Sequence, residues 1–462
     1  MTIKEILELQ DESKRIAALK EKAVQVPAWQ NLVKEYDPRR HPVMSKALYP
    51  DISRKDGSVE KVTRITLNFQ RLAVKRMTEL VCGVPVKRVY KPENDRQKEV
   101  ATYLEKIFMR NHIDSVNVER CNMLFASCEV MTLWYAVEEQ NKIYGFDSAL
   151  KFRCINFSPM NGDAIYPLFD EYGDLMALSV ETNRTIGNKT YQYFDSFIAG
   201  HHIKWSNESG TWIKTEDDDK ITIKKIPAVY MFRPTPIWED TSNNVFEMEW
   251  SLSRNGNYLR KNSKPIFAVF ADEQIKFGGE DSKGEENKPR AVLQYPKGSN
   301  AQYVTWQQAV ESLKYQVETL RSLFFTQLQL PDWSYEKMSQ QALSGESRKQ
   351  LFVDCQLKVK DESGPLLEFF EREMNVVKAF LKAALGDAYA GDIDALETEI
   401  IITPFSITDE KDTIANIMAA NGNQPVISQR ESIEMLGWSD NPDKTLEEIR
   451  QESMADIFEP TE

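Results

Sequence analysis

The chain of 462 residues has no long hydrophobic run. Its most apolar window, Cys121 to Val137, is 17 residues long and includes Glu129, whereas a helix needs about 20 apolar residues to cross a bilayer. The first fifteen residues carry a charge every few positions and lack the apolar stretch of a secretory signal peptide. We therefore expect a protein that is made and kept inside a cell and has no membrane segment.

Cysteine, glycine and proline are also scarce. The five cysteines are scattered along the chain with no C-x-x-C pair, so the sequence predicts neither a disulfide framework nor a zinc ribbon. Glycine and proline together account for 39 residues (19 + 20), which excludes collagen-like and low-complexity chains. With 41% hydrophobic and 28% charged residues, we expect a folded protein of about three domains, or one elongated chain with insertions.

Sequence motifs for catalysis and metal binding are missing. The chain has four histidines, His41, His112, His201 and His202, and no H-E-x-x-H pattern. Residues 279–284 have the glycine spacing of a phosphate loop, but Glu285 and Glu286 stand where a lysine and a hydroxyl residue are needed, so an ATPase is rejected. We expect no enzyme, no cofactor and no metal. A nuclease whose scattered carboxylates assemble a two-metal site remains an alternative.

Charge is unevenly distributed along the chain, whose net charge is −13. Residues 54–110 carry 14 Lys and Arg against 7 Asp and Glu, whereas residues 406–462 carry 4 against 13. Duplex DNA presents one negative charge per about 1.7 Å of its axis, so the basic region could meet phosphates and the acidic region would repel them. The alternative is that both are simply solvated surfaces.

Helical and β patterns alternate in the first half of the chain. Apolar residues at helical spacing end before Asp37-Pro38 and again before Gly83-Val84-Pro85, both of which stop a helix. From 130 to 212 the pattern changes to short β-rich runs, which predict the sheet of the protein. The elements expected before that sheet are helices over 3–36, 66–82 and 95–110 and a strand over 86–90.

Two helices of similar length flank a small insertion in the second half. Residues 239–262 and 306–328 predict helices of 24 and 23 residues, each about 35 Å long at 1.5 Å per residue. The insertion, residues 263–305, contains the strand patterns IFAVFA and RAVLQY around a polar loop. Such helices can pair antiparallel and hold the insertion at the end of a stalk.

The second of these helices carries the strongest periodic signal in the chain. Its apolar residues are spaced 4, 3, 4, 3, 4, like the a and d positions of a coiled coil. A stripe of this kind requires a partner. Burial within the same domain and an intersubunit seam are equally compatible with it. The residues of this stripe, expected to pack the stem, are Trp306, Val310, Leu313, Val317, Leu320 and Phe324.

A polar loop and a long helical segment ending near Leu385 follow. Within the segment, Pro365 cannot donate a backbone hydrogen bond and Gly364 precedes it, so we expect a kink at these two residues. A strand is expected over 399–403, before an acidic helical tail.

The order of these elements resembles the bacteriophage portal protein family, in the branch typified by phages of Gram-positive hosts. The resemblance covers nearly the whole chain and rests on several segments in order. These are Asn68-Phe69 through Gly83-Val84-Pro85, FSPMNGDAIYPLFDEYGDLMALSVE, IPAVYMFRP before a helix, insertion and helix, the Ser344-Gly345 loop before a long helix, and the ending TPFSITDEKDTIANIMAANGNQPVISQRESIEMLGWSDNPDKTLEEI.

The resemblance implies an elongated multi-domain α+β portal fold that assembles into a ring with a central channel. Residues 1–237 would form the N-terminal part of the wing and residues 329–405 the tunnel loop, long helix and wing strand. Residues 238–262 and 306–328 would be the stem helices, 263–305 the clip, and 406–462 an acidic helical crown.

The resemblance also implies roles for individual residues. Lys337, Arg348 and Lys349, in or next to the tunnel loop, are candidates for contact with DNA in the channel. The clip residues that would dock terminase or an adaptor are Phe267, Phe270, Lys276, Arg290 and Tyr295.

As an implied function, the ring, usually of twelve subunits, conducts double-stranded DNA at one capsid vertex during packaging and ejection and nucleates procapsid assembly. The implied partners are other copies of the chain, the terminase large subunit, major capsid and scaffolding proteins and a head-completion adaptor. The expected location is the virion, after assembly in the host bacterial cytoplasm. The alternatives are another virion structural or adaptor protein without a DNA channel, or a metal-dependent DNA-processing enzyme.

Overall fold

The computed structural model describes residues 3–21, 24–215, 219–220, 223–262, 266–270, 300–304, 310–332, 353–405, 410–422, 426–439 and 441–458. Helices and strands are both abundant, and the fold is α+β, as predicted. The chain divides into two compact units. The first unit is Met1–Leu32, Arg71–Trp238 and Leu328–Glu462, and the second is Val33–Gln70 and Glu239–Gln327.

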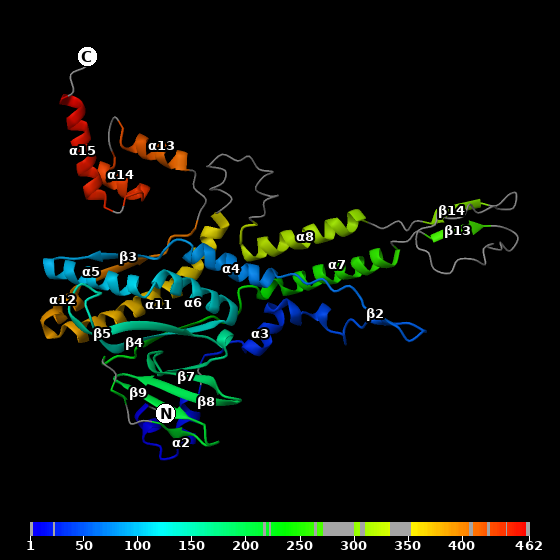
Figure 1. Ribbon diagram of the computed structural model, residues 1–462, viewed down its shortest axis with the longest axis horizontal. Helices are drawn as coiled ribbons and strands as arrows, with labels where there is room; N and C mark the ends of the chain where they lie inside the picture. Colours follow the sequence, from blue (N-terminus) through cyan, green and yellow to red (C-terminus); the bar gives the residue numbers. More distant parts are fainter. Residues whose placement is uncertain are drawn as a thin grey trace. The chain divides into compact units, whose positions relative to one another are not determined.

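The first unit holds most of the secondary structure (Figure 1). Its helices are α1 (Ile3–Leu7), α2 (Glu12–Leu19), α5 (Asp95–Arg110), α6 (Ile113–Ser127), α11 (Val353–Leu385), α12 (Ala390–Ala395), α13 (Glu410–Ala420), α14 (Gln429–Leu436) and α15 (Pro442–Phe458). The boundary between the units falls inside α3 (Trp29–Tyr36) and α4 (Phe69–Cys82). Its strands are β3 (Lys87–Lys91), β4 (Glu129–Asn141), β5 (Ser148–Phe157), β6 (Ala164–Phe169), β7 (Leu175–Ile186), β8 (Lys189–Ile198), β9 (His201–Ser206), β10 (Ile213–Lys214), β11 (Asp219–Lys220), β12 (Ala228–Phe232) and β15 (Glu397–Ile401).

The β-rich region forms two principal sheets, where the sequence predicted one. One is antiparallel in the order β10-β9-β8-β7-β6, with β11 paired to β9, and the other has the order β12-β4-β5. The two sheets share a core, because buried residues of β4 and β12, such as Met131 and Tyr230, pack with residues of β6, β7 and β8, such as Leu178 and Phe197. The short helices α1 and α2 close the other core of the larger sheet through Ile6, Ile16 and Leu19.

Local sequence explains the clearest helix of this unit. The Asn94 side chain caps α5 by accepting a hydrogen bond from the backbone N–H of Gln97 at 2.8 Å. Val100, Leu104 and Ile107 are buried, and their spacing of four and three residues places them on one face of the helix. The helix ends at Arg110, so its observed bounds match the expected range 95–110.

In the second unit, two helices run antiparallel (Figure 1). They are α7 (Ser242–Asn262), preceded by the short 3-10 turn η4 (Glu239–Thr241), and α8 (Val310–Leu328). Asn244 in the first turn of α7 donates a hydrogen bond from Nδ2 to Oε1 of Gln327 in the last turn of α8, at 2.8 Å. The pairing of these two helices was predicted. Between them, β13 (Ile266–Phe270) pairs with β14 (Asn300–Val304). The first strand was expected, but its partner lies after the RAVLQY run, which is outside the described residues.

The segment 33–70 also belongs to the second unit, because it is hydrogen-bonded along α7. Glu249, Ser253 and Asn257 are spaced one helical turn apart on α7. They accept the backbone N–H groups of Leu67 at 2.6 Å, Ile65 at 2.8 Å and Thr63 at 2.6 Å, respectively. Two residues of extended chain cover about the same length as one turn of helix, so the two repeats stay in register.

Gly256 of α7 makes this close approach possible, since a Cβ atom at that position would lie 2.8 Å from Cγ2 of Thr63. The glycine costs helix propensity but permits tight packing. The remaining elements of this unit are η1 (Pro38–Arg40), η2 (Pro42–Met44), β1 (Ile52–Ser53) and β2 (Val59–Glu60). Residues 33–70 thus belong to a different unit from residues 71–238.

Candidate functional site

The long helix α11 begins just after residues 333–352, the segment that contains Lys337, Arg348 and Lys349 and lies outside the described residues. One face of α11 is apolar and buried, including Val359, Phe370 and Phe380. This face packs on β12, β4 and β5. Helix α11 is therefore fixed to this sheet, and the residues predicted to form the tunnel loop precede it in the sequence.

A buried ion pair fixes the middle of α11 to α6. Arg120 donates from Nη1 to Oε1 of Glu373 at 2.6 Å and from Nη2 to Oε2 at 2.7 Å. Trp134 of β4 donates to the same carboxylate from Nε1 at 2.9 Å. The side chains of Arg120 and Glu373 are only 2% and 1% exposed, and the guanidinium also lies 4.7 Å from the centre of the Phe369 ring.

The environment of Glu373 keeps its carboxyl group ionised. Burial alone would raise its pKa, but the charge of Arg120 and the hydrogen bonds from Arg120 and Trp134 outweigh burial and hold the pKa below its ordinary value of 4.5. A carboxylate with three donors on its two oxygens is well satisfied, so the pair behaves as a fixed structural joint.

A second ion pair holds α11 closer to its N-terminus. Arg233, which follows β12, pairs with Glu362, and Lys358 approaches the same carboxylate at 3.3 Å. The backbone N–H of Arg233 also donates to the carbonyl of Cys128 at 2.7 Å. The joints at Glu362 and Glu373 lie on either side of Gly364 and Pro365, where a kink is predicted.

The helix is continuous across Gly364 and Pro365, and Pro365 stands in its interior. The proline leaves the carbonyl four residues earlier without its usual donor. Ser363 donates from Oγ to the carbonyl of Lys360 at 2.7 Å, a side-chain bond of the kind that often accompanies local bending. The kink itself stays a prediction.

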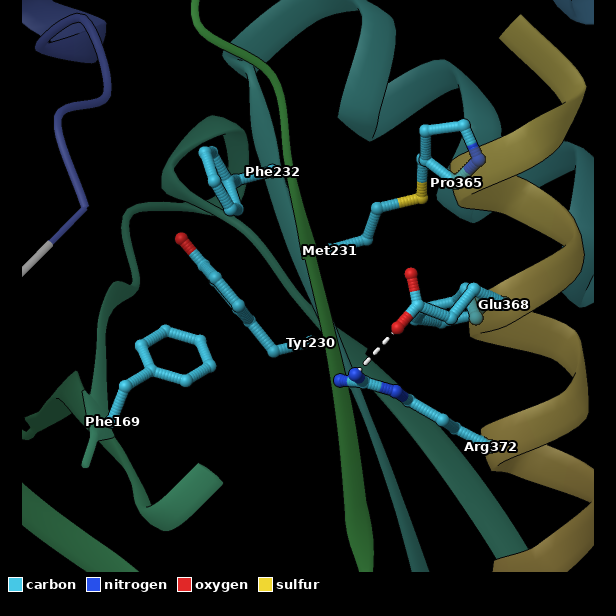
Figure 2. A pocket seen from close by; sticks show the side chains of 8 residues that line it. Phe169, Tyr230, Met231, Phe232, Pro365, Glu368 and Arg372 are labelled. Atoms are coloured by element: carbon cyan, nitrogen blue, oxygen red, sulfur yellow. Dashed lines mark hydrogen bonds and ion pairs between the residues drawn. The ribbon is translucent and has the colours of Figure 1, made fainter. Parts of the chain in front are cut away.

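A pocket of about 180 Å³ lies beside Pro365. Figure 2 shows Met231 of β12 extending toward Pro365 of α11, whereas Tyr230 and Phe232 extend to the other side of the strand. The Tyr230 hydroxyl donates to Oε2 of Glu129 at 2.8 Å, and burial, followed by the Glu129 charge, raises the pKa of Tyr230. The pocket is smaller than a typical ligand site of about 300–1,000 Å³, and its lining is mainly apolar.

The predicted stem stripe on α8 is buried at one end only. Phe324 is fully buried, with its ring 4.9 Å from Phe69 and 5.3 Å from Phe325. Leu313, Val317 and Leu320 are half-buried, and Val310 is 57% exposed. Trp306 lies outside the described residues. The stripe is therefore only partly covered within one copy of the chain.

The predicted clip residues are described only in part. Phe267 and Phe270 belong to β13, opposite Tyr303 and Asn300 of β14. Lys276, Arg290 and Tyr295 lie outside the described residues.

The sequence did not anticipate side-chain pairs such as Arg120 with Glu373, His41 with Glu249, and Cys82 with Cys121. A buried charged residue such as Arg120 requires a partner, but the local sequence does not identify it.

Within the described parts of the chain, no group of three or more His, Cys, Asp or Glu residues is placed to hold a metal ion. Among the same residues, no helix combines the length and the apolar character required to span a bilayer.

Comparison with solved structures finds chains of low sequence identity that align over most of this chain. A chain of the "Virion of native gene transfer agent (GTA) particle" is 11% identical, with a TM-score of 0.40, and the alignment covers 92% of this chain and 98% of that one. A chain of the "Neck of empty GTA particle computed with C6 symmetry" is 12% identical, with a TM-score of 0.40, and the alignment covers 88% of this chain and 95% of that one. A chain of the "Neck of native GTA particle computed with C12 symmetry" is 12% identical, with a TM-score of 0.42, and the alignment covers 92% of this chain and 98% of that one. Comparison with curated proteins gives no match.

The family described as phage portal protein, SPP1 Gp6-like, matches residues 18–457. This range contains the second structural unit, most of the first, the two antiparallel helices with their β insertion, and the long helix α11. The sequence resemblance to portal proteins is thereby confirmed. The chain belongs to the phage portal protein family.

Proposed function

We propose that the chain is the subunit of a portal ring, usually of twelve copies in this family, which forms a DNA conduit at one vertex of a capsid. The family match over residues 18–457 carries this proposal. The ring would pass double-stranded DNA during packaging and ejection and nucleate procapsid assembly in the host cytoplasm. Its partners would be terminase, capsid and scaffolding proteins and a head-completion adaptor. The chain itself would have no enzymatic role.

Within this proposal, α7 and α8 are the stem helices, and the β13–β14 hairpin belongs to the clip. The sheets and α11 belong to the wing, and α13, α14 and α15 form the crown. The net negative charge of residues 406–462 would repel a duplex and keep it centred if the crown faces the channel. Sparse cations in the tunnel loop suit a passing duplex, because each neutralised phosphate adds affinity and therefore drag.

The uncovered part of the α8 stripe supports ring closure. Val310, the first described residue of the stripe, is apolar and 57% exposed, whereas Phe324 at the other end is fully buried. A ring uses one surface patch against a different patch of the next copy, repeated by rotation. We propose that the exposed end of the stripe is covered by a neighbouring copy.

Replacing Val310 by glutamate should leave the subunit folded and abolish ring formation. The side chain is mostly exposed in one copy, so the stability change should stay within about 0.5 kcal/mol. In a closed ring the same carboxylate would be buried without a partner at every interface. Native mass measurement and negative-stain images of the purified variant give the oligomeric state.

Tyr315→Glu is the matched control, because Tyr315 lies on the same helix outside the stripe and is 73% exposed. This variant should still form rings. Rings of normal size from Val310→Glu would exclude the stripe from the intersubunit seam, and a wild-type chain that stays monomeric would contradict the portal proposal as a whole.

The proposed DNA contact is tested by replacing Lys337, Arg348 and Lys349 together by alanine. The amount of DNA packaged in an assay with terminase and procapsids should fall several-fold, since these cations would meet phosphates in the channel. Ring formation should be unchanged.

Three exposed lysines far along the sequence from the loop, Lys55, Lys142 and Lys189, provide a control with the same loss of charge, and their replacement should not affect packaging. Loss of the ring in the loop variant would refute the assignment of this loop to the channel. A stable wild-type monomer that cleaves DNA with Mg²⁺ would support the nuclease alternative instead.

A further inference from the structure

Two cysteines that are far apart in the sequence meet in the first unit. Cys82 is the last residue of α4 and Cys121 lies in α6, and their Sγ atoms are 3.1 Å apart. Both thiols are free in this structure. A disulfide requires about 2.05 Å between the sulfur atoms, so the two sulfurs need to approach by only about 1 Å for a bond to form.

Both thiols of the pair are shielded from solvent. Cys82 and Cys121 are 7% and 1% exposed. The hydrogen bond with Cys82, followed by burial, raises the pKa of the Cys121 thiol well above its ordinary value of 9.0. The thiolate is the reactive form, so Cys121 reacts slowly at neutral pH and more readily as the pH rises.

We propose that Cys82 and Cys121 are an oxidation site that forms an intramolecular disulfide with a small peroxide as the oxidant. The sulfur of Cys82, the more exposed of the two, attacks one peroxide oxygen and becomes a sulfenic acid, and the other peroxide oxygen leaves as water with the Cys82 proton. The sulfur of Cys121 then attacks the Cys82 sulfur, and the sulfenic oxygen leaves as water with the Cys121 proton. In total, two thiols and one hydrogen peroxide give one disulfide and two waters, and the peroxide takes up both electrons.

The cross-link would join two points that already lie at structural joints. The α4 end is hydrogen-bonded to the later chain, because the N–H of Phe405 donates to the carbonyl of Leu80 at 3.0 Å. On α6, Cys121 directly follows Arg120, which is paired with Glu373 of α11. A covalent bond here would therefore tie the end of α4 to the helix that anchors α11, and would close a loop across 39 residues of sequence.

The conditions under which the pair would be oxidised depend on the proposed function. A subunit made in a reducing cytoplasm and then released in a particle passes into oxidising surroundings, where disulfides persist. The bond itself requires only the folded chain, so it can form whether or not the chain closes into a ring.

The test uses the purified full-length protein, treated with hydrogen peroxide under native conditions and then alkylated and digested. We expect two of the five thiols to be lost and a peptide containing Cys82 to be linked to one containing Cys121, faster at pH 9 than at pH 7. The melting temperature of the oxidised protein should rise by about 5 °C, because the cross-link restricts the unfolded chain. A thiol reductant should reverse both changes.

Matched variants show whether the pairing is specific. Cys154→Ala should leave the cross-link and the melting shift unchanged, whereas Cys82→Ala and Cys121→Ala should each abolish both. The proposal is overturned if all five thiols survive oxidation of the native protein, or if Cys121 is linked to Cys154 or to any cysteine other than Cys82.

Discussion

Replacing Glu373 by glutamine should lower the free energy of unfolding by about 3–5 kcal/mol, because it removes the charge partner of the buried Arg120. Glutamine keeps the shape of glutamate. Its single carbonyl oxygen can accept only some of the three hydrogen bonds that the carboxylate accepts from Arg120 and Trp134. The guanidinium would then stay charged and buried without compensation. Denaturant unfolding followed by circular dichroism measures the loss.

The same substitution one and a half turns earlier on α11 is the control. Glu368 pairs with Arg372 at 2.5 Å, but these side chains are 62% and 50% exposed, and exposed pairs contribute at most about 1 kcal/mol. Glu368→Gln should therefore cost little. Replacing Arg120 and Glu373 together by methionine should recover much of the stability, since neither charge is then left alone. Equal losses for the Glu373 and Glu368 variants would contradict the role of the buried pair.

The acid sensitivity of this joint follows from the lowered pKa of Glu373. Because the carboxyl pKa is lower in the folded state than its ordinary value of 4.5, the stabilisation is complete above that value and is lost as the pH falls through the folded pKa. The wild type should therefore lose stability relative to Glu373→Gln on acidification below about pH 4.5. Equal acid dependence of the two proteins would argue against an ionised Glu373.

Replacing His41 by alanine should destabilise the second unit by about 3–5 kcal/mol. His41 Nδ1 lies 2.7 Å from Oε1 of Glu249, and Nε2 lies 2.7 Å from the carbonyl oxygen of Glu35. Both ring nitrogens of His41 therefore have a polar partner within the second unit. The His41 and Glu249 side chains are completely buried, so the variant would leave the buried Glu249 carboxyl group without this hydrogen-bond partner.

Hydrogen exchange locates the effect of this substitution. Glu249 also accepts the N–H of Leu67, the first of the three bonds that hold 63–67 along α7, so the amides of this segment should exchange faster in His41→Ala. His202→Ala, which removes a histidine of the first unit that is 20% exposed and paired with Asp195 at 3.0 Å, should leave the exchange of these amides unchanged. Unchanged protection of the amide of Leu67 would mean that His41 does not fix this segment.

The sequence predicted elements well where local signals agree. Helix α5 has both a capping residue, Asn94, and a periodic apolar face, and its bounds were predicted correctly. Helix α6 was not expected, because Asn117 and Arg120 are buried together with its apolar residues, so the helix has no clear polar face. A helix buried on most sides loses the periodic contrast by which helices are recognised.

Partners that are distant in sequence could not be predicted. Arg120 and Glu373 are 253 residues apart, and nothing local to either one identifies the other. The same holds for the segment 63–67 on α7. Its hydrogen bonds depend on the match between two residues of extended chain and one turn of helix. For the candidate site, the sequence indicated the long helix and its proline, while the contacts that hold this helix required the structure. The tunnel-loop residues remain predictions.

The short sheet of β3 and β15 has a consequence for synthesis. Lys91 pairs with Glu397 in this sheet, 306 residues further along the chain. At about 5–20 residues per second, the ribosome needs roughly 15–60 s between these two points, and during that time the edge of β3 waits without its native neighbour. A nascent chain released before residue 397 never gains this neighbour, so the open edge of β3 remains available for pairing with another chain.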